Sequence, residues 1–337
     1  MTRRHGRLGL LAFGLLAFGL LGLSRCHSPL GSSSVSFEKR HDSVAIGING
    51  APFSVLHFGK AVRMPHLHPL LTASGTAVTR GFPVAPLPGD STDRPNHRGL
   101  TIGAQRVRGP TGLFFWGQNF FDNDPSNAGP DKGTIAFQEI TGLQSGEDSG
   151  TLSLVAHWIS HEGQVWLIER RQMTFYSKPA DCRMFDIDLE LEAAAEVTFG
   201  DYQSSLVALR LDLPFDEHYG GRAVIAAGGV NEAEVRGRRS PWLDWSATLR
   251  NGEKVAVAMI DHPENLDHPA RWQVRAKGFF MANPFGRQTF ARFDPTAADE
   301  NGEHTLKRGD KLRLRYRVVI RPAERELDGF WREYAGR

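Results

Sequence analysis

Hydrophobic and polar residues alternate with a period of two along much of this chain. Residues 183–193, RMFDIDLELEA, place an apolar side chain at every second position and a carboxylate at most positions between. Residues 311–320, KLRLRYRVVI, alternate in the same way with basic residues, and similar patterns mark 151–160, 170–176 and 254–260. Such alternation is typical of strands with one buried face and one face in water. The charged rows of 183–193 and 311–320 therefore predict a solvated sheet face.

The segments between the alternating stretches favour antiparallel pairing. Glycine-bearing segments at 144–150 and 160–164 separate consecutive predicted strands and are typical of hairpin turns. Helical spacing of apolar residues is clear only at 325–337, and the chain has no repeat of solenoid length. We therefore predict an all-β fold, a large antiparallel β-sandwich with a short C-terminal helix.

The N-terminus has the pattern of a secretory signal. A basic stretch, MTRRHGRLG, precedes an apolar run that ends near residue 23 and is short for a membrane span, which needs about 20 residues. We predict a signal peptide or lipoprotein signal at 1–26, a serine-rich linker at 27–36 and one β-sandwich domain at 37–337. An uncleaved membrane anchor is an alternative. LGLSRC resembles a bacterial lipobox ending at Cys26, although Arg25 stands where that pattern has a small residue.

These features predict an exported protein, periplasmic or lipid-anchored in a bacterial envelope. The formal net charge of 337 residues is only +2, and the basic residues are scattered, so we expect no nucleic-acid partner. The chain has no phosphate loop, no GxSxG, no HExxH and no CxxC motif. We accordingly expect no cofactor and no metal.

Two polar clusters lie in the first third of the chain. His66 and His68 sit between prolines and share one face of an extended strand, so they could hold one metal, line a pocket or serve ordinary packing. The stretch 90–105, DSTDRPNHRGLTIGAQ, is the second cluster. Its candidate ligand-binding residues are Arg94, Asn96, His97 and Arg98, and the aromatic segment that follows contains Trp116, a residue for sugar stacking or for the core.

Two further clusters lie in the second half. Asp201 follows a glycine at an expected strand end, where a carboxylate can face a cleft. Residues 261–287 contain two Asp-His-Pro triplets, and a histidine beside a carboxylate has a fixed tautomer and a raised pKa that suits general acid catalysis. The alternative is that the aspartates form turns and the histidines merely pack. The candidate residues here are Asp261, His262, His268, Trp272 and Asn283.

Several blocks together resemble the DUF6807 family. HPLLTASGTAVTRGFP, DRPNHRGLTIGAQRVRGPTGLFFWG, VTFGD, GGVNEAEVRGRRSPWLDWS, IDHPENLDHPARWQVRAKGFFMANPFG and LRYRVVI occur in the family's order over about residues 60–320. The resemblance implies a galactose-mutarotase-like super-sandwich with a sugar site of histidine, arginine, tryptophan and acidic residues. Three positions depart from the family pattern: Asn96 replaces a histidine, Gln203 a lysine and Ser204 a glutamate.

These observations predict a carbohydrate-active protein that performs acid/base chemistry on a sugar, of the epimerase, lyase or glycosidase type. One alternative is a sugar-binding lipoprotein without catalysis, favoured by the missing lysine and glutamate. Another is a metal-dependent oxygenase, because the family is often labelled a methane oxygenase. For an enzyme, we expect His97 or His268 as general acid, Asp201 or Asp261 as base, Arg94 and Arg98 on substrate oxygens, and Trp272 stacked on the ring.

Overall fold

In the computed structural model, the alternating segments form long antiparallel strands. The structure describes residues 34–59, 62–109, 112–113, 115, 132–294 and 301–337. The stretch predicted at 183–193 is β11 (Arg183–Ala193), and the stretch at 311–320 begins β20 (Lys311–Pro322). The other three predicted strands are also present, as β9 (Ser149–Ile159), β10 (Val165–Tyr176) and β16 (Lys254–Asp261).

The first sheet contains eight strands of the described chain and carries the site discussed below. Its order is β1-β2-β3-β4-β5-β13-β18-β17, and all neighbouring strands are antiparallel. Their bounds are β1 (Val35–Lys39), β2 (Ser43–Ile48), β3 (Ala51–His57), β4 (His66–Leu70), β5 (Leu100–Ala104), β13 (Ser205–Arg210), β18 (Phe279–Asn283) and β17 (Arg271–Arg275).

The second sheet, also eight-stranded within the described residues, has the order β14-β15-β16-β20-β11-β10-β9-β8. Its strands β14 (Arg222–Ile225), β15 (Trp242–Thr248) and β8 (Thr134–Gln144) join those already given. A small third sheet consists of β19 (His304–Leu306), β12 (Val197–Phe199), β6 (Val107–Arg108) and β7 (Gly112–Leu113). The described helical elements are η2 (Leu213–Phe215), η3 (Glu217–Tyr219), α1 (Asn231–Val235), η4 (Gln288–Phe290) and α2 (Asp328–Ala335).

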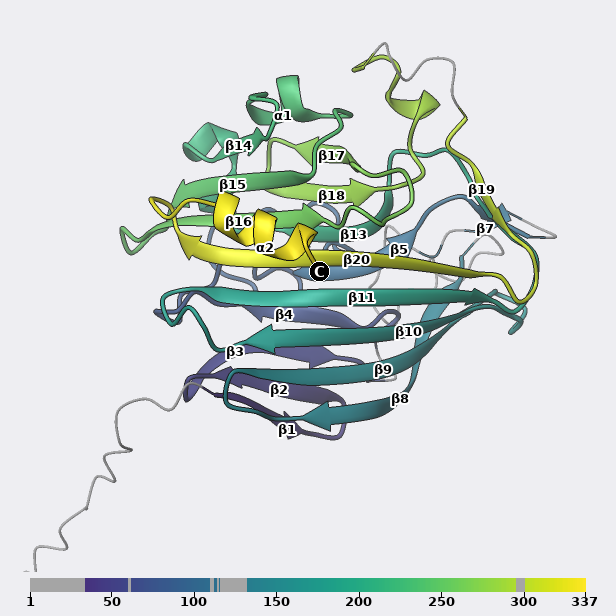
Figure 1. Cartoon of the computed structure of the whole chain (residues 1–337), viewed down its shortest axis with the longest axis horizontal. Helices are drawn as coiled ribbons and strands as arrows, with labels where there is room; N and C mark the ends of the chain where they lie inside the picture. Colours follow the sequence, from purple (N-terminus) through teal and green to yellow (C-terminus); the bar gives the residue numbers. More distant parts are fainter. Residues whose placement is uncertain (1–33, 60–61, 110–111, 114, 116–131, 295–300) are drawn as a thin grey trace, which may run out of the picture. The chain divides into compact units, whose positions relative to one another are not determined.

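The two large sheets pack face to face through aromatic side chains. Phe53 of β3 contacts Phe175 of β10 and Phe185 of β11, with ring centroids 6.1 and 5.9 Å apart. Trp245 of β15 approaches Phe280 of β18 at 6.0 Å. Burial of such large apolar faces is the main force that holds a sandwich together. The predicted large antiparallel β-sandwich is thus confirmed, as is the short C-terminal helix, α2 (Figure 1).

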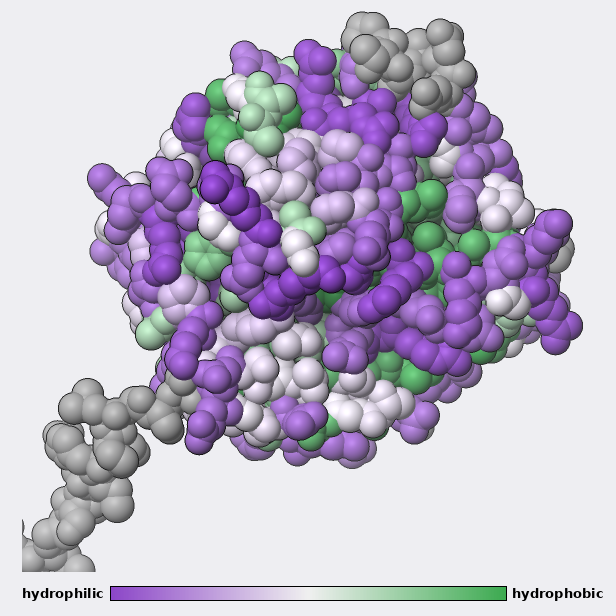
Figure 2. Space-filling view, in the orientation of Figure 1, coloured by the Kyte–Doolittle hydropathy of each residue, from purple (hydrophilic) through white to green (hydrophobic). Residues whose placement is uncertain are grey.

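The outer face of the second sheet carries the charged rows seen in the sequence. Asp186, Asp188, Glu190 and Glu192 of β11 stand opposite basic residues of β20, and the two rows form ion pairs, some directly across and some diagonal, such as Asp188 with Arg313. The Asp186–Arg317 contact measures 2.6 Å and the Glu190–Lys311 contact 2.9 Å. Figure 2 shows this face as largely hydrophilic. The rows therefore pair with each other and give the sheet a solvated outer surface.

The described residues, from 34 to 337, form one compact unit. The division predicted for residues 1–36 stays a prediction, since residues 1–33 lie outside the described part. Among the described helices, none is long and apolar enough to cross a membrane.

Candidate functional site

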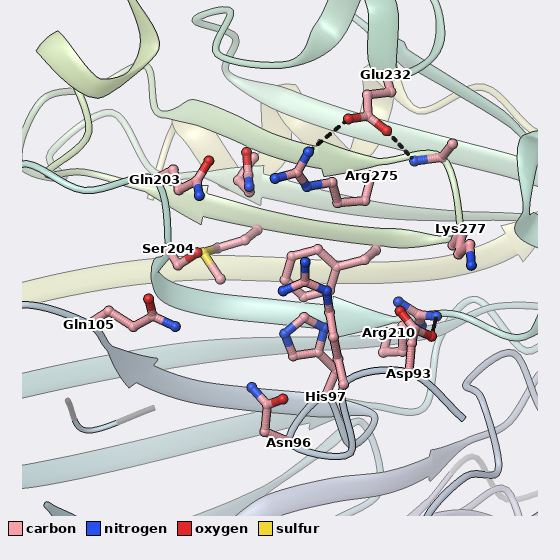
Figure 3. A pocket seen from close by; sticks show the side chains of 15 residues that line it. Asp93, Asn96, His97, Gln105, Gln203, Ser204, Arg210, Glu232, Arg275 and Lys277 are labelled. Atoms are coloured by element: carbon pink, nitrogen blue, oxygen red, sulfur yellow. Dashed lines mark hydrogen bonds and ion pairs between the residues drawn. The ribbon is translucent and has the colours of Figure 1, made fainter. Parts of the chain in front are cut away.

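A cavity of about 430 Å³ lies on the outer face of the first sheet. Strand alternation places Gln273 of β17 with Phe279 and Met281 of β18 on the cavity side. The opposite face of the same strands carries Phe280, which packs toward Trp245 of the second sheet. We call this space the sheet cavity (Figure 3). Its lining residues are Asp93, Arg94, Asn96, His97, Gln105, Gln203, Ser204, Arg210, Glu232, Gln273, Arg275, Ala276, Lys277, Phe279 and Met281.

One wall is the polar loop before β5, and Arg80 holds it in shape. Arg80 is only 2% exposed, and its guanidinium donates to the backbone oxygens of Ser91, Asp93, Arg94 and His97 at 2.8–3.2 Å. Arg94 adopts a left-handed φ of 47°, which is uncommon for a residue with a β-carbon. The bonds from Arg80 stabilise that conformation and so fix the wall.

Asp93 joins this wall to β13 as an ion pair. Its Oδ1 accepts from Arg80 at 3.1 Å and from Arg210 at 2.8 Å. Burial raises the pKa of Asp93, but Arg210, the Ser91 hydroxyl and Arg80 lower it more, so the pKa lies below its usual value. Asp93 is therefore ionised and its charge is already matched by arginines.

His97 stacks on the cavity floor. Its ring lies 4.1 Å from the ring of Phe279 at an interplanar angle of 15°. Burial, and then the charges of Arg210 and Arg94, hold the pKa of His97 well below its usual value. The imidazole is therefore neutral near pH 7, which suits a proton acceptor better than the general acid we expected from the sequence.

The opposite wall is a network around Glu232 of α1. Its Oε1 accepts from Arg236 at 3.2 Å and from Arg275 at 3.1 Å. Arg236 also donates to Gln203 at 2.9 Å and to Gln273 at 3.2 Å. Both carboxylates that line the sheet cavity are thus paired with arginines.

Asp201 lies outside the cavity lining and acts as a backbone cap. Its two carboxylate oxygens accept from the backbone N–H groups of Arg287, Gln288, Thr289 and Gly302 at 2.8–3.3 Å. These bonds tie the 201–204 loop to the start of η4. With its oxygens occupied in this way, Asp201 supports Gln203 and Ser204 rather than facing the cavity as the expected base.

Asn283, like Asp201, holds the 201–204 loop in place. It is buried, donates to the backbone oxygen of Tyr202 at 2.7 Å and accepts from the N–H groups of Phe285 and Gly286. It therefore positions the cavity wall without lining the cavity.

Asp261 and His268 form a close pair, but away from the sheet cavity. His268 Nδ1 lies 2.8 Å from Asp261 Oδ2, and Asp261 also accepts from Asn265 and from the backbone N–H of Ala270. Asp261 is 1% exposed, while His268 is 20% exposed and stacks near Trp331 of α2 at 6.3 Å. The predicted hydrogen-bonded pair is present, yet neither residue lines the sheet cavity.

His262 and Trp272 are packed side chains. His262 is buried, accepts from the N–H of Glu264 at 3.1 Å and lies edge-on to Tyr334 of α2. Trp272 is 0% exposed on the core face of β17, and its indole N–H donates to the Ser240 oxygen at 2.9 Å. It has no exposed ring face for the sugar stacking that the sequence led us to expect.

His66 and His68 of β4 are buried beside the site. His66 donates to the Met64 oxygen at 3.2 Å, and His68 donates to the Arg80 oxygen at 3.0 Å. Arg98, with His66 and Asn96, lines a separate small cavity of about 10 Å³, room for one water molecule. In the described part of the chain, no group of three or more His, Cys, Asp or Glu side chains is arranged to hold a metal. Trp116 lies outside the described residues.

Sequence reasoning found one end of the sheet cavity and missed the rest. Arg94, Asn96 and His97 line it as expected. Most of the missed residues lie in the two singled-out stretches 90–105 and 261–287 but outside their histidine motifs; the KGFFMAN stretch supplies Phe279 and Met281, which resemble ordinary core in the sequence. Those missed are Asp93, Gln105, Arg210, Glu232, Gln273, Arg275, Ala276, Lys277, Phe279 and Met281.

The buried histidines make stability sensitive to acid. Burial lowers the pKa of His68 to about 4 and the pKa values of His66 and His97 well below 6.5. Below pH 6.5 the unfolded chain takes up protons that the folded protein does not, so stability is lost as pH falls, for His68 down to about pH 4. We expect each of these histidines to cost about 1.4 kcal/mol per pH unit in this window. Urea unfolding at pH 7.5 and 5.5 measures this, and equal free energies at both would contradict it.

Comparison with known proteins assigns a family but no activity. A model described as "Family of unknown function (DUF6807)" matches residues 43–329, which confirms the resemblance seen in the sequence. No curated protein matches the chain.

Solved structures similar to this chain include galactose mutarotase relatives. One is a galactose mutarotase related enzyme from Lactobacillus acidophilus, 10% identical, with TM-score 0.36, covering 87% of this chain and 99% of its own. Another is a galactose mutarotase-like protein from Clostridium acetobutylicum, 11% identical, with TM-score 0.35 and coverage of 86% and 98%. A protein from Synechocystis is 10% identical, with TM-score 0.39 and coverage of 86% and 96%. Likeness at this level carries no argument about function.

Proposed function

The chain belongs to the DUF6807 family of unknown function, and we propose that it binds a carbohydrate in the sheet cavity. The observation that carries the proposal is an apolar floor surrounded by amide side chains. Phe279 and Met281 supply the floor, where His97 covers one face of Phe279; the C–H face of a sugar ring would pack on the edge of this His97–Phe279 stack and on Met281. The volume of about 430 Å³ suits a small sugar.

The amides around this floor suit hydroxyl groups. Asn96, Gln105, Gln203 and Gln273 each carry both a donor and an acceptor, and Ser204 adds a hydroxyl. A sugar hydroxyl also donates and accepts, so such a lining can satisfy several hydroxyls at once. Gln203 and Gln273 are held in place by Arg236, which reduces the entropy lost on binding.

Acid/base chemistry at His97 is the second candidate function. It is favoured by the neutral imidazole stacked on the cavity floor. Binding stands first because Asp93 and Glu232, the lining carboxylates, are both engaged by arginines and so poorly placed to supply a second acid or base.

The oxygenase alternative gains no support from the described side chains, which contain no metal-ligating group of three. Export and lipid anchoring are further proposals that rest on residues 1–26.

Filling the cavity tests the proposal. Ser204→Trp places an indole in the sheet cavity, and we expect at least a tenfold loss of affinity for the tightest-binding sugar in a calorimetric screen of monosaccharides and oligosaccharides. Ser149→Trp, at an exposed position on β9, is the matched control and is expected to bind like the parent.

Two results would count against this function. No sugar binding by the parent protein would refute it, and so would unchanged affinity in Ser204→Trp. Where a sugar is turned over, His97→Gln separates the two candidates: binding kept with turnover lost assigns catalysis to His97.

A further inference from the structure

The sheet cavity has an excess of positive charge. Its lining contains four cationic side chains, Arg94, Arg210, Arg275 and Lys277, against the two carboxylates of Asp93 and Glu232. These carboxylates also bind arginines behind the lining: Arg80 donates to Asp93, and Arg236 donates to Glu232. Cationic side chains therefore outnumber carboxylates in the lining itself, while Asp90 acts on Arg80 and Asp216 on Arg210 from outside it.

The positive charge is concentrated at one end. Figure 3 shows Lys277 and Arg210 near Asp93 at one end, and Gln105, Gln203 and Ser204 at the other. Arg210 is 2% exposed, and its Nε is buried without a hydrogen-bond partner. Lys277 is exposed, and its charge acts on Asp93. A buried guanidinium with an unused donor, beside an exposed ammonium, is an arrangement that an anionic group would stabilise.

The arginines behind the lining show the same imbalance. Burial lowers the pKa of Arg80 to about 10, and the charge of Arg210 adds to that effect. Burial also lowers the pKa of Arg236 to about 10, with Arg275 as the next cause. In both walls, buried cationic groups repel one another, and at the Asp93 wall an anion bound beside Arg210 would relieve that repulsion.

We propose that the ligand of the sheet cavity is an anionic sugar, whose carboxylate or phosphate lies at the Lys277–Arg210 end and whose hydroxyls lie at the Gln105–Gln203 end. This inference rests on the proposed function and adds the substrate class. The two ends of the cavity are then complementary to two different parts of one molecule. Charge-assisted donors at one end bind the anionic group, and amides at the other end bind the hydroxyls.

Paired sugars test the anionic group directly. Calorimetry would compare galacturonate with galactose, and glucose 6-phosphate with glucose, for the parent protein. We expect at least one anionic member to bind roughly tenfold more tightly than its neutral partner, as for hydrogen bonds to charged groups. The pair with the larger preference identifies the anion as carboxylate or phosphate.

The variant Lys277→Gln removes one exposed charge and should leave folding intact. It is expected to lower affinity for the anionic sugar at least about fivefold more than affinity for the neutral sugar, so that most of the preference is lost. Lys39→Gln, at an exposed lysine of β1, is the matched control and should keep the preference. Raised salt should lower the affinity for the anionic sugar and leave the affinity for the neutral sugar unchanged.

The outcomes distinguish this inference from the function it rests on. Equal affinity for charged and neutral sugars, or a preference unchanged in Lys277→Gln, overturns the inference and leaves sugar binding standing. If inorganic phosphate binds as tightly as glucose 6-phosphate and neither neutral sugar binds, the cavity recognises the phosphate alone and the sugar proposal is refuted. A lack of binding by every sugar in both pairs refutes both.

Discussion

Arg80→Met is expected to lower the free energy of unfolding by about 3–5 kcal/mol, the cost typical of breaking a buried ion pair. The substitution removes one of the two arginines that bind Asp93, leaving Arg210 and the Ser91 hydroxyl, and deprives four backbone oxygens of the loop before β5 of their donor. Because this loop forms one wall of the sheet cavity, ligand affinity should fall as well. Chemical denaturation and calorimetry on the same sample measure the two effects.

The matched control is Arg222→Met, at an exposed position on β14. It should change the free energy of unfolding by less than about 0.5 kcal/mol. A loss below 1 kcal/mol in Arg80→Met would mean that the loop holds its shape without this side chain, contrary to the hydrogen bonds described.

Asp261→Ala is expected to lower stability about as much as Arg80→Met but, unlike Arg80→Met, to leave ligand affinity nearly unchanged. Removing the carboxylate leaves the side-chain amide of Asn265, the ring of His268 and the N–H of Ala270 without their acceptor in a buried place. We expect a loss of about 3–4 kcal/mol in the free energy of unfolding. Ligand affinity of the folded fraction should stay within about twofold of the parent, since Asp261 does not line the sheet cavity.

This second prediction separates a structural aspartate from a functional one. Asp148→Ala, which removes an exposed carboxylate paired with Lys178, is the control and should be nearly neutral. If Asp261→Ala folds but loses tenfold or more in ligand affinity, Asp261 and His268 take part in ligand binding, as the sequence suggested.

The strands could be predicted from the sequence because most of them have one buried face and one solvent-exposed face. β11 buries Phe185, Ile187 and Leu189 and exposes carboxylates between them, so its period of two is visible in the sequence. β18 buries every residue, some in the core and some under the cavity, and its sequence FFMAN has no such alternation. The floor of the sheet cavity therefore could not be predicted from the sequence pattern.

The site could be predicted only in part, because sequence motifs do not report which sheet they join. His97 precedes β5 of the first sheet, whereas Asp261 ends β16 of the second, so two clusters expected to share one pocket lie on different sheets. The Asp-His pairing was predictable from local spacing. The arginine networks around Asp93 and Glu232 were not, since several of their contacts join residues more than 30 positions apart, such as Gln203 with Arg236 and Asp93 with Arg210.

The three departures from the family pattern lie together. Asn96, Gln203 and Ser204 all line the sheet cavity, although two of them are more than 100 positions from the first. The resemblance seen in the sequence implies a lysine and a glutamate where this chain has Gln203 and Ser204. We therefore expect the ligand of this chain to differ from that of relatives that keep those charges.

A crystal structure with the tightest-binding sugar tests the central claim most directly. The account predicts a sugar ring against the His97–Phe279 stack and Met281, with its hydroxyls on Gln105 and Gln203 and any anionic group toward Lys277. A sugar bound instead at His268 and Trp331, with the sheet cavity empty, would contradict it.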